Sequence, residues 1–528
     1  MVRTPSFHDG NMGSNPIKDI FFIFLVFCFK TKTFKMNSYK MFESLLVNIA
    51  MLPLLGILLL ILIPHKNSKM LKLIALNFSS LPLIGSLVLW FFFKDFLGQF
   101  QFVTKLYWFS SLNINVALGI DGISLFFLIL TTLLIPICIL LSWSSVKKDL
   151  KEYLIAFLFL EFFLILVFGI LDLLLFYIFF ESVLIPMFLI IGIWGSRERK
   201  ILASYYFFLY TLFGSVIMLL AIVYIYYQVG TTDYEMLLTF SFSEFEQKFL
   251  WFAFFLAFAG KVPMLPVHHW LPEAHTEAPT AGSVILAGVL LKLGTYGLIR
   301  YSIPLFPNAS FFFTPFVYTL SVIGIIYTSF TAIRQSDFKR IIAYTSIAHM
   351  NLVILGIFSF NNIGVEGAIV QSLSHGFVAS ALFLVIGIVY DRYHTRIVKY
   401  YSGLASVMPL YILIFVFFTM ANISFPGTSS FVGEFLILTG SFKCSTSVAF
   451  LGATGVILGG AYSLWLLNRI AFGNMKIQYC EKFLDLNKRE FMCFLPLILG
   501  TLILGLCPNI VLSSLKSSVN YLIESIYF

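Results

Sequence analysis

Six ionisable side chains lie in the middle of long apolar runs of this sequence. They are two acids, two lysines and two histidines, namely Glu181, Lys261, Lys292, His349, His375 and Glu434. A charged side chain at the centre of a bilayer is costly, so residues of this kind mark functional sites by default. Burial and neighbouring charges can bring Glu, Lys and His to exchange protons near neutral pH, whereas Arg, which is absent from the set, stays charged. The residue types therefore favour proton transfer.

Two of the apolar runs that carry these residues are interrupted. Lys261 is followed directly by Pro263 and Pro266, and Pro426 precedes Glu434 in a Pro-Gly-Thr-Ser-Ser stretch. Proline removes a backbone donor and breaks a helix. Interrupted segments at corresponding positions of two halves of a membrane protein point to a transport site. An accidental pair of proline kinks in a large bundle is the simpler alternative.

Composition predicts where these residues are held. Hydrophobic residues make up 59% of the 528 residues, charged residues only 11%, and the mean hydropathy is +0.95. A membrane-spanning helix needs about 20 apolar residues. We predict an all-α polytopic membrane protein with about fourteen transmembrane helices, at 44–64, 70–94, 118–142, 153–171, 172–194, 204–228, 249–271, 280–300, 313–333, 340–359, 365–390, 403–441, 448–468 and 492–513.

The fourteen predicted helices divide into two similar sets. Helices 4 to 8, at about 153–300, and helices 9 to 13, at about 313–468, each contain five crossings, and an odd number forces the second set to be inverted. The broken seventh helix then corresponds to the broken twelfth. We predict one transmembrane domain at 44–528. Residues 1–43, whose apolar core is too short to span and resembles part of a signal peptide, are interpreted as a dispensable or processed extension.

The six groups are predicted to share one depth. With a rise of about 1.5 Å per residue, each lies about 13 to 18 Å from an end of its predicted helix, near the middle of a core about 30 Å thick. A side chain at this depth cannot reach the headgroups, so it must face the bundle interior, paired or hydrated. A single Glu-Lys pair can be structural glue, but six groups at one level favour a proton path.

Lysine and arginine alternate between the predicted loops. Twenty follow odd-numbered helices and five follow even-numbered ones, which predicts that the basic loops face the inner side and both mature termini the outer side. A surface that binds nucleic acid would not alternate, so the net charge of +9 does not indicate nucleic acid. The basic clusters are Lys66/Lys69/Lys72, Lys147/Lys148/Lys151, Arg197/Arg199/Lys200, Arg334/Lys339/Arg340, Arg392/Arg396/Lys399 and Arg469/Lys476/Lys482/Lys488/Arg489, and the other loops hold Lys94, Lys105, Lys248, Arg300 and Lys443.

Other chemistries find less support in the sequence. An ion channel is expected to show rings of like charge or a carbonyl filter, and neither is visible. There are no haem-type histidine pairs, no iron-sulfur cysteines and no G-x-G-x-x-G after a strand. The six cysteines show no C-x-x-C or other ligand spacing, so we expect neither a metal site nor a disulfide framework in this chain.

A further polar cluster follows the break in the seventh helix. It contains His268, His269, Glu273, His275 and Glu277, of which His268 is a candidate for proton entry on the inner side. Simple loop polarity is an equally good interpretation. Histidine spacing alone does not predict a metal here, because Pro272 is expected to interrupt any helix that would align the ligands.

Three acids outside this cluster have simpler interpretations. Asp121 starts the third predicted helix and is expected to cap it. Glu161 has apolar neighbours and is expected to approach either Glu181 or a neighbouring subunit. Asp337, together with Lys339 and Arg340, is expected to form a solvated turn.

Six stretches around the ionisable residues form a specific set of motifs. They are Phe176-Tyr-Ile-Phe-Phe-Glu181, the stretch from Lys261 to His275, Ala278-Pro-Thr-Ala-Gly-Ser283 with Lys292, Ile342-Ala-Tyr-Thr-Ser-Ile-Ala-His349, Ser374-His375-Gly376 and Pro426-Gly-Thr-Ser-Ser-Phe-Val-Gly-Glu434. Together they resemble the antiporter-like, proton-translocating subunits of respiratory complex I, in particular the NADH dehydrogenase subunit 4 family. The resemblance extends from about residue 44 to the C-terminus, whereas the first forty-odd residues depart from it.

The resemblance implies a role for each residue of the polar set. Glu181 and Lys261 would form the coupled pair of one half-channel, Lys292 would connect the halves, and His349 and His375 would lead to Glu434 in the other. Protons would move as quinone is reduced in partner subunits, and this chain would hold no cofactor. NAD, FMN, iron-sulfur clusters and ubiquinone would lie in those partners, which include two further antiporter-like subunits.

The implied location is the mitochondrial inner membrane, with several crossings, lipid contacts and basic loops facing the matrix. Two other classes of function remain open at this stage. The chain could belong to a cation/proton antiporter complex, or it could be an assembly scaffold that does not pump. A plastid relative would differ mainly in its compartment and its electron donor.

Overall fold

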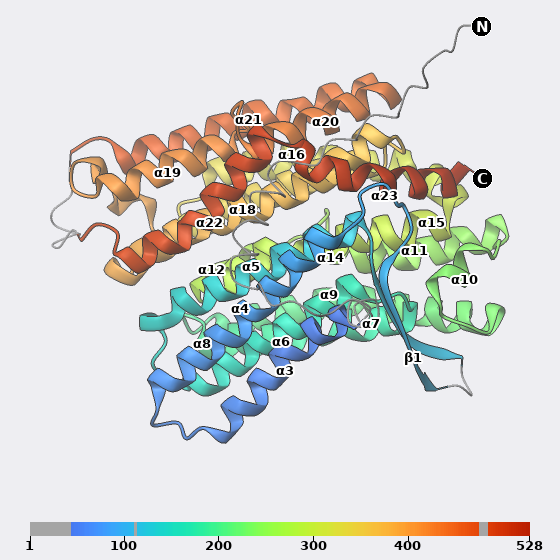
Figure 1. Ribbon diagram of the computed structural model, residues 1–528. Coiled ribbons are helices and arrows are strands. Elements are labelled where there is room, and N and C mark those ends of the chain that lie inside the picture. The colour runs from blue at the N-terminus through green and yellow to red at the C-terminus, as the bar shows by residue number, and fades with distance from the viewer. Residues whose placement is uncertain (1–43, 110–112, 475–483, 528) are drawn as a thin grey trace, which may run out of the picture. The chain divides into compact units, whose positions relative to one another are not determined.

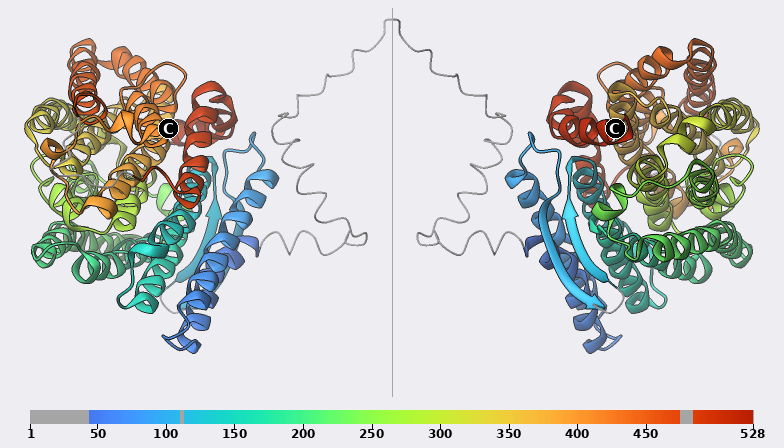
Figure 2. Two further views of the ribbon diagram at one scale, coloured as in Figure 1. Left: turned by 90° about the vertical axis from the view of Figure 1, so that its left-hand side faces the viewer. Right: turned by 90° about the vertical axis from the view of Figure 1, so that its right-hand side faces the viewer.

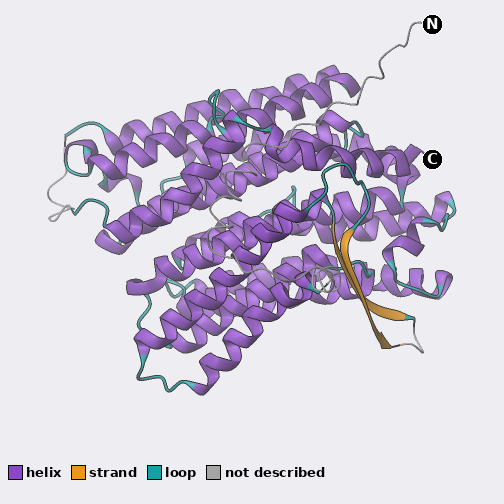
Figure 3. Cartoon of the chain, viewed as in Figure 1, coloured by secondary structure: helices purple, strands orange, loops and turns teal. Residues whose placement is uncertain are grey.

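The computed structural model describes residues 44–109, 113–474 and 484–527, and long helices dominate this part of the chain (Figures 1 and 3). Twelve of the described helices are long and apolar enough to cross a membrane. They are α3 (Leu45–Leu62), α4 (Ser68–Phe92), α5 (Gly122–Ser145), α6 (Leu150–Gly169), α7 with α8 (Leu173–Trp194), α9 (Lys200–Val229), α13 to α15 (Thr280–Leu305), α16 (Pro307–Arg334), α17 (Phe338–Ile357), α18 (Asn362–Tyr393), α21 (Thr446–Ala471) and α22 (Lys488–Leu506).

Two further predicted crossings are helix pairs with a break between them. The predicted segment 249–271 corresponds to α11 (Glu244–Lys261) and α12 (Trp270–Glu277), and the segment 403–441 to α19 (Pro409–Asn422) and α20 (Ser429–Cys444). Both breaks lie where the prolines predict them. At the second, Gly427 has a φ of 91°, a left-handed conformation that favours glycine. The all-α membrane fold is confirmed, while the count of fourteen and the inverted repeats stay predictions.

The described loops with basic clusters meet at one end of the bundle, here called the basic end. Hydrogen bonds join them there: Lys151 Nζ to Ile63 O, Trp194 Nε1 to Lys148 O, Ser196 N to Glu277 O, Phe338 N to Arg396 O and Leu410 N to Asp485 Oδ2. The predicted alternation of charge therefore corresponds to the two ends of the described helices.

The opposite end carries a strand pair and two helices that are not membrane crossings. Strands β1 (Gln101–Phe109) and β2 (Ile114–Ile120) form an antiparallel hairpin beside α3 (Figure 2). The short α10 (Tyr234–Leu238) and the C-terminal α23 (Asn509–Tyr527) lie at this hairpin end (Figure 1). The Ser514 Oγ of α23 donates to Asp95 Oδ1 at 2.6 Å, and Gly122 N donates to Ser518 Oγ at 2.9 Å, so α23 is tied to the start of α5.

A buried ion pair lies at the hairpin end. Asp121 caps α5 as predicted, because its Oδ1 accepts from Ser124 N at 2.9 Å, but its Oδ2 also lies 2.6 Å from Arg300 Nη2. Arg300 is therefore not a loop charge, as its sequence position suggested, but a buried partner of Asp121. The rings of Phe100, Tyr234 and Tyr296 surround its guanidinium group at 4.9 to 5.7 Å. Burial raises the pKa of Tyr234, on α10, to about 12, so this phenol stays neutral.

Two cations of the basic end are buried as well. Lys339 Nζ donates to Ala278 O at 2.8 Å, and the Arg396 guanidinium donates to Thr276 O and Ser196 Oγ. These carbonyls belong to the C-terminal end of α12, where positive charge is favourable. Asp337 caps α17 by accepting from Lys339 N at 2.9 Å. The prediction of a solvated turn is therefore wrong for Lys339, whose charge holds α12 in place.

Helices α18 and α20 approach each other along a row of glycines. A Cβ added to Gly440 would lie 2.5 Å from the Gly364 Cα, and one added to Gly433 would lie 2.7 Å from backbone atoms of Gln371. Small residues allow such close approach between membrane helices. This contact matters for the site because α18 and α20 carry His375 and Glu434.

We expect Gly440→Ala to destabilise the chain and Gly460→Ala to leave its stability unchanged or raised. The added methyl group at 440 meets backbone, which costs about 1 to 3 kcal/mol when a packed core is overfilled. At Gly460 the nearest atom lies 3.8 Å away, so the gain in helix propensity remains. The thermal midpoint of the full chain in solubilised membranes tests this, and equal midpoints for the two variants would contradict it.

Removing Arg300 alone should destabilise the chain more than removing the whole ion pair. Arg300→Met leaves Asp121 buried without its partner, which typically costs about 3 to 5 kcal/mol, whereas pairs replaced together by uncharged groups are often tolerated. The double variant Arg300→Met with Asp121→Asn keeps a helix cap and should recover thermal stability. If the double variant is no more stable than Arg300→Met in the same thermal assay, the unpaired charge of Asp121 is not the cause of the lost stability.

Candidate functional site

Lys261 lies at the last residue of α11 and is almost fully buried. Its Nζ donates to Phe180 O at 2.6 Å, lies 3.8 Å from Glu181 Oε1 and stands 3.4 Å from the centre of the Phe180 ring. Phe180 and Glu181 are in the final turn of α7 (Leu173–Ser182), beside the irregular residue Val183 that separates it from α8 (Leu184–Trp194). The predicted Glu181–Lys261 pair is therefore present in the structure.

Lys292 is fully buried in the irregular crossing from 280 to 305. Its Nζ donates to Ala287 O at 2.5 Å and to His375 Nδ1 of α18 at 2.8 Å. Ala287 belongs to the π-helical turn η2 (Leu286–Leu290), and a second turn, η3 (Leu298–Ser302), follows α14 (Leu291–Gly297). Such turns alter the regular backbone hydrogen bonding and are frequent at functional sites. Here one supplies an oxygen acceptor to a fully buried lysine.

Glycine also brings Lys292 within reach of His375. A Cβ on Gly288 would lie 2.7 Å from the Ser380 Oγ of α18, and one on Gly376 would lie 3.2 Å from Gly288 O. The two helices can approach this closely only because neither residue carries a side chain. The Lys292 Nζ and the His375 imidazole can therefore make direct contact.

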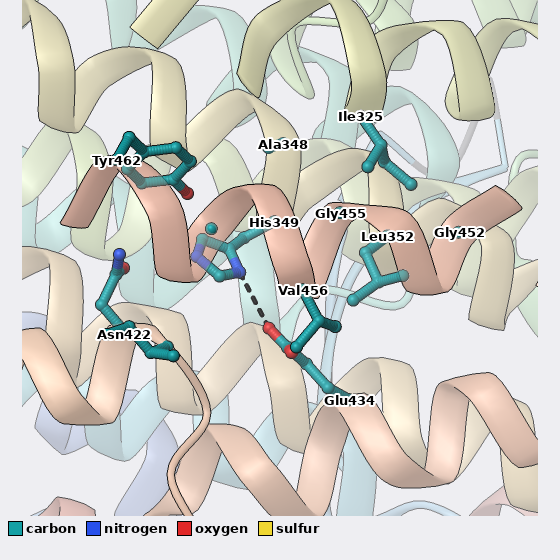
Figure 4. Close-up of a pocket in the computed structure, with 12 residues that line it drawn as sticks. Ile325, Ala348, His349, Leu352, Asn422, Glu434, Gly452, Gly455, Val456 and Tyr462 are labelled. Carbon is teal, nitrogen blue, oxygen red and sulfur yellow. Dashed lines mark hydrogen bonds and ion pairs between the residues drawn. The ribbon is translucent and has the colours of Figure 1, made fainter. Parts of the chain in front are cut away.

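His349 and Glu434 form the outer part of this chain of contacts. The His349 Nδ1 lies 3.0 Å from Glu434 Oε1 (Figure 4). Gln371 Nε2 donates to the same oxygen at 3.1 Å. The rings of His349 and His375 have centroids 5.9 Å apart. Lys292, His375, His349 and Glu434 therefore form a series across α14, α18, α17 and α20, with close contacts everywhere except between the two histidine rings.

A small cavity opens beside His349 and Glu434. Its volume is about 20 Å³, which is enough for about one water molecule. Asn422 and Tyr462 line it together with the bare backbone of three glycines of α21 (Figure 4). A water in this position would have polar partners on several sides, as a proton carrier requires.

The Glu181–Lys261 pair is separate from the series that runs from Lys292 to Glu434. No hydrogen bond joins Lys261 to Lys292 among the residues that the structure describes. The helices that carry them are in close contact, because a Cβ on Gly294 would lie 2.5 Å from the Val262 Cγ2. The structure thus brings the six predicted residues together as one pair and one series of four, and transfer between the two lysines needs water or movement.

His268 lies beyond the first break and is buried, with its ring beside those of His269, at 4.2 Å, and Tyr327, at 6.0 Å. Neither of its ring nitrogens has a hydrogen-bond partner in the described part of the chain. Pro272 does not interrupt a helix here, contrary to the sequence-based expectation. It lies in the first turn of α12, where proline is tolerated because the first amide groups have no partner within the helix.

Glu161 is fully buried in α6, and both of its carboxylate oxygens lack partners in the described part of the chain. Burial within its own chain excludes contact with a neighbouring subunit. Gln371, Asn422 and Tyr462 were not predicted as site residues. Gln371 stands one helical turn before His375 on the same face, so it was accessible to sequence reasoning, whereas nothing in the sequence distinguishes Tyr462. No group of three or more potential metal ligands forms among the described residues.

The sequence model of the family described as "NADH:quinone oxidoreductase/Mrp antiporter, TM" matches residues 171–459. NADH-ubiquinone oxidoreductase chain 4 of Marchantia polymorpha is 59% identical over 483 residues, which cover 92% of this chain and 98% of the relative. The protein of the same name from Arabidopsis thaliana is 59% identical over 472 residues, which cover 89% and 95%.

Among solved structures, a chain of respiratory complex I from Thermus thermophilus with bound NADH is similar. The TM-score is 0.83 at 28% sequence identity, and the match covers 91% of this chain and 99% of that chain. Every part of the site described above lies within the region matched by the family model or close to it. The chain belongs to the NADH:quinone oxidoreductase/Mrp antiporter transmembrane family, and within it to NADH-ubiquinone oxidoreductase chain 4.

Proposed function

We propose that this chain translocates protons through Glu181, Lys261, Lys292, His375, His349 and Glu434 as a membrane subunit of complex I, while quinone is reduced in partner subunits. The observation that carries this proposal is the buried series in which Lys292 Nζ meets His375 at 2.8 Å and His349 meets Glu434 at 3.0 Å. Groups that can gain and lose protons follow one another at hydrogen-bond distance or with room for a single water between them.

The Glu181–Lys261 pair would act as the switch. At about 4 Å and an effective dielectric constant near 20, two unit charges attract by about 4 kcal/mol, so an ionised Glu181 holds the proton on Lys261. Movement of Glu181 away from Nζ removes this attraction and frees the proton toward Lys292. The Phe180 carbonyl oxygen, 2.6 Å from Nζ, keeps the lysine in place during the change.

The second half would work as a relay. A proton on Lys292 Nζ can pass to His375 Nδ1 along the existing contact. The His375 and His349 rings, 5.9 Å apart, each keep an Nε2 without a partner among the described residues, so a water between them has two polar neighbours. Glu434 accepts at the end of the series, and the direction of exit is taken from the family resemblance.

We also propose where the proton enters the chain and which partners surround it. The proton enters from the basic end near His268, and that end faces the mitochondrial matrix. Partners are other membrane-arm subunits, among them two further antiporter-like subunits, and lipids. NAD, FMN, iron-sulfur clusters and ubiquinone are held by partner subunits. The relatives named NADH-ubiquinone oxidoreductase chain 4 and the similarity to a chain of a complete complex I support this assignment.

Removing either member of the switch should uncouple this chain from pumping. We expect Lys261→Ala and Glu181→Gln to lower its contribution to proton uptake at least about tenfold, because a positioned proton-transfer group typically contributes about 10²- to 10⁴-fold and water can replace part of it. Proton uptake per NADH oxidised, in vesicles with fully assembled complex, measures this.

The matched control is Glu161→Gln, which changes a fully buried acid outside the series and should leave uptake unchanged. Normal uptake in the Lys261 and Glu181 variants would favour an inert assembly scaffold. Purification of the chain without flavin and iron-sulfur subunits would instead favour a cation/proton antiporter complex.

Two substitutions of Lys292 distinguish a proton carrier from a fixed charge. Lys292→Met removes both the charge and the proton, whereas Lys292→Arg keeps the charge but holds its proton at all relevant pH values. We expect both variants to lose this chain's share of proton uptake in the same vesicle assay. Retention of uptake by Lys292→Arg alone would mean that position 292 supplies charge and that the proton takes another route.

A further inference from the structure

A second group of buried titratable side chains lies between the basic end and the Lys292–His375 contact. At its centre is His275 of α12, which is fully buried, with no hydrogen-bond partner at either ring nitrogen among the described residues. Leaving a buried polar group unsatisfied costs about 1 to 3 kcal/mol. A phenylalanine would fill the same space without this cost, so the imidazole requires an explanation other than packing.

The backbone of His275, though not its ring, is linked to Lys339 through Ser283 on the side of the basic end. The Ser283 Oγ donates to His275 O at 3.2 Å, and Lys339 Nζ donates to the same Ser283 hydroxyl, also at 3.2 Å. Lys339 in turn lies in the electrostatic field of Asp391, Glu277, Asp337 and Arg396, which come from α18, α12, the start of α17 and the loop after α18. Lys339 is therefore the innermost charge of a cluster that begins at the loops.

On its other side His275 faces the Lys292–His375 contact. Its ring stacks on Phe383 of α18, with centroids 4.4 Å apart and planes 9° apart. Phe383 lies eight residues beyond His375, about 12 Å along the helix. The Ser380 Oγ of α18 donates to Val284 O at 3.3 Å, and Lys292 Nζ donates to Ala287 O at 2.5 Å, so polar groups continue along α13 and η2 from Ser283 toward Lys292. The imidazole thus stands between a charge toward the loops and the start of the four-residue series.

We propose that His275 is a proton relay that connects Lys339, at the basic end, with the Lys292–His375 pair, so that the second half of the path has its own entry beside the one at His268. This inference rests on the proposed function of the series. It adds a second route to Lys292 that does not pass through Lys261.

The transfer conserves atoms and charge. An N–H bond of Lys339 breaks and an N–H bond forms on one ring nitrogen of His275, with water as the carrier. The proton on the other ring nitrogen leaves for Lys292 or His375, each in its neutral form. No electrons change hands. A path of about 12 Å needs three or four waters at ordinary hydrogen-bond spacing of about 2.8 Å, and the Ser283 and Ser380 hydroxyl groups lie along it.

The test compares His275→Phe with Glu434→Gln in vesicles that contain the assembled complex. Phenylalanine keeps the stack on Phe383 and removes both nitrogens, so a merely structural role of the ring is preserved. The difference in proton uptake between the parent chain and Glu434→Gln defines the share carried by this chain. We expect His275→Phe to remove more than half of that share, and Lys339→Arg, which keeps the charge but cannot release its proton, to do the same.

The control is His65→Phe, which changes an exposed histidine at the basic end and should have no effect. The thermal midpoint of the full chain with His275→Phe, compared with that of the parent chain, shows whether the variant is folded. If Glu434→Gln lowers uptake and His275→Phe removes less than half of the share, the relay is overturned while the proposed function stands. If Glu434→Gln itself has no effect, the proposed function fails and the relay fails with it.

Discussion

The cost of placing charge in the apolar interior of the bundle is the constraint on which the rest of the structure depends. Each charged group inside it must find its partners within the protein. The two lysines meet this need in the same way, through a backbone carbonyl freed where a helix is irregular: Phe180 O beside the end of α7 for Lys261, and Ala287 O in a π-helical turn for Lys292. Broken and distorted helices are thus what allows titratable groups to exist at this depth.

The same irregular elements link the two halves of the path. Helix α12 follows the break after Lys261, and its C-terminal carbonyls are held by Lys339 of α17 and by Arg396 of the loop after α18. Arg340 pairs with Glu273 in the middle of α12. Because α17 carries His349 and α18 carries His375, these contacts join α12 to the helices that hold the proposed relay. On the proposed function, they are the physical link between the Lys261 side and the Lys292 side of the path.

Much of this organisation could be predicted from the sequence, because a charged residue within an apolar run can be recognised without knowing the fold. The helices, the two breaks and the six ionisable residues of the series and the pair follow from apolar length, proline and isolated charge. The partners do not, since they depend on faces and close approaches that only the packed bundle defines. Arg300 and Lys339 show the difference: in the sequence they belong to loops, but in the structure they are buried against Asp121 and the end of α12.

Gln371 and Tyr462 were missed for a related reason. Placing a neutral polar residue in a helix costs little free energy, so the sequence does not mark such a residue as part of a site. Only the distance of Gln371 to Glu434 and the position of Tyr462 on the cavity wall connect them with the site. The pairing of Glu181 with Lys261 came from the family resemblance and is now supported by a contact of 3.8 Å.

The most direct test of the central claim is to observe a proton on Glu434 during turnover. Infrared difference spectra of the assembled complex, recorded as NADH reduces quinone, report the carbonyl stretch of a protonated carboxyl group. Our account predicts a transient carboxyl band that disappears in Glu434→Gln and fails to form in Lys292→Met. A spectrum in which Glu434→Gln and the parent chain show the same carboxyl bands would contradict it.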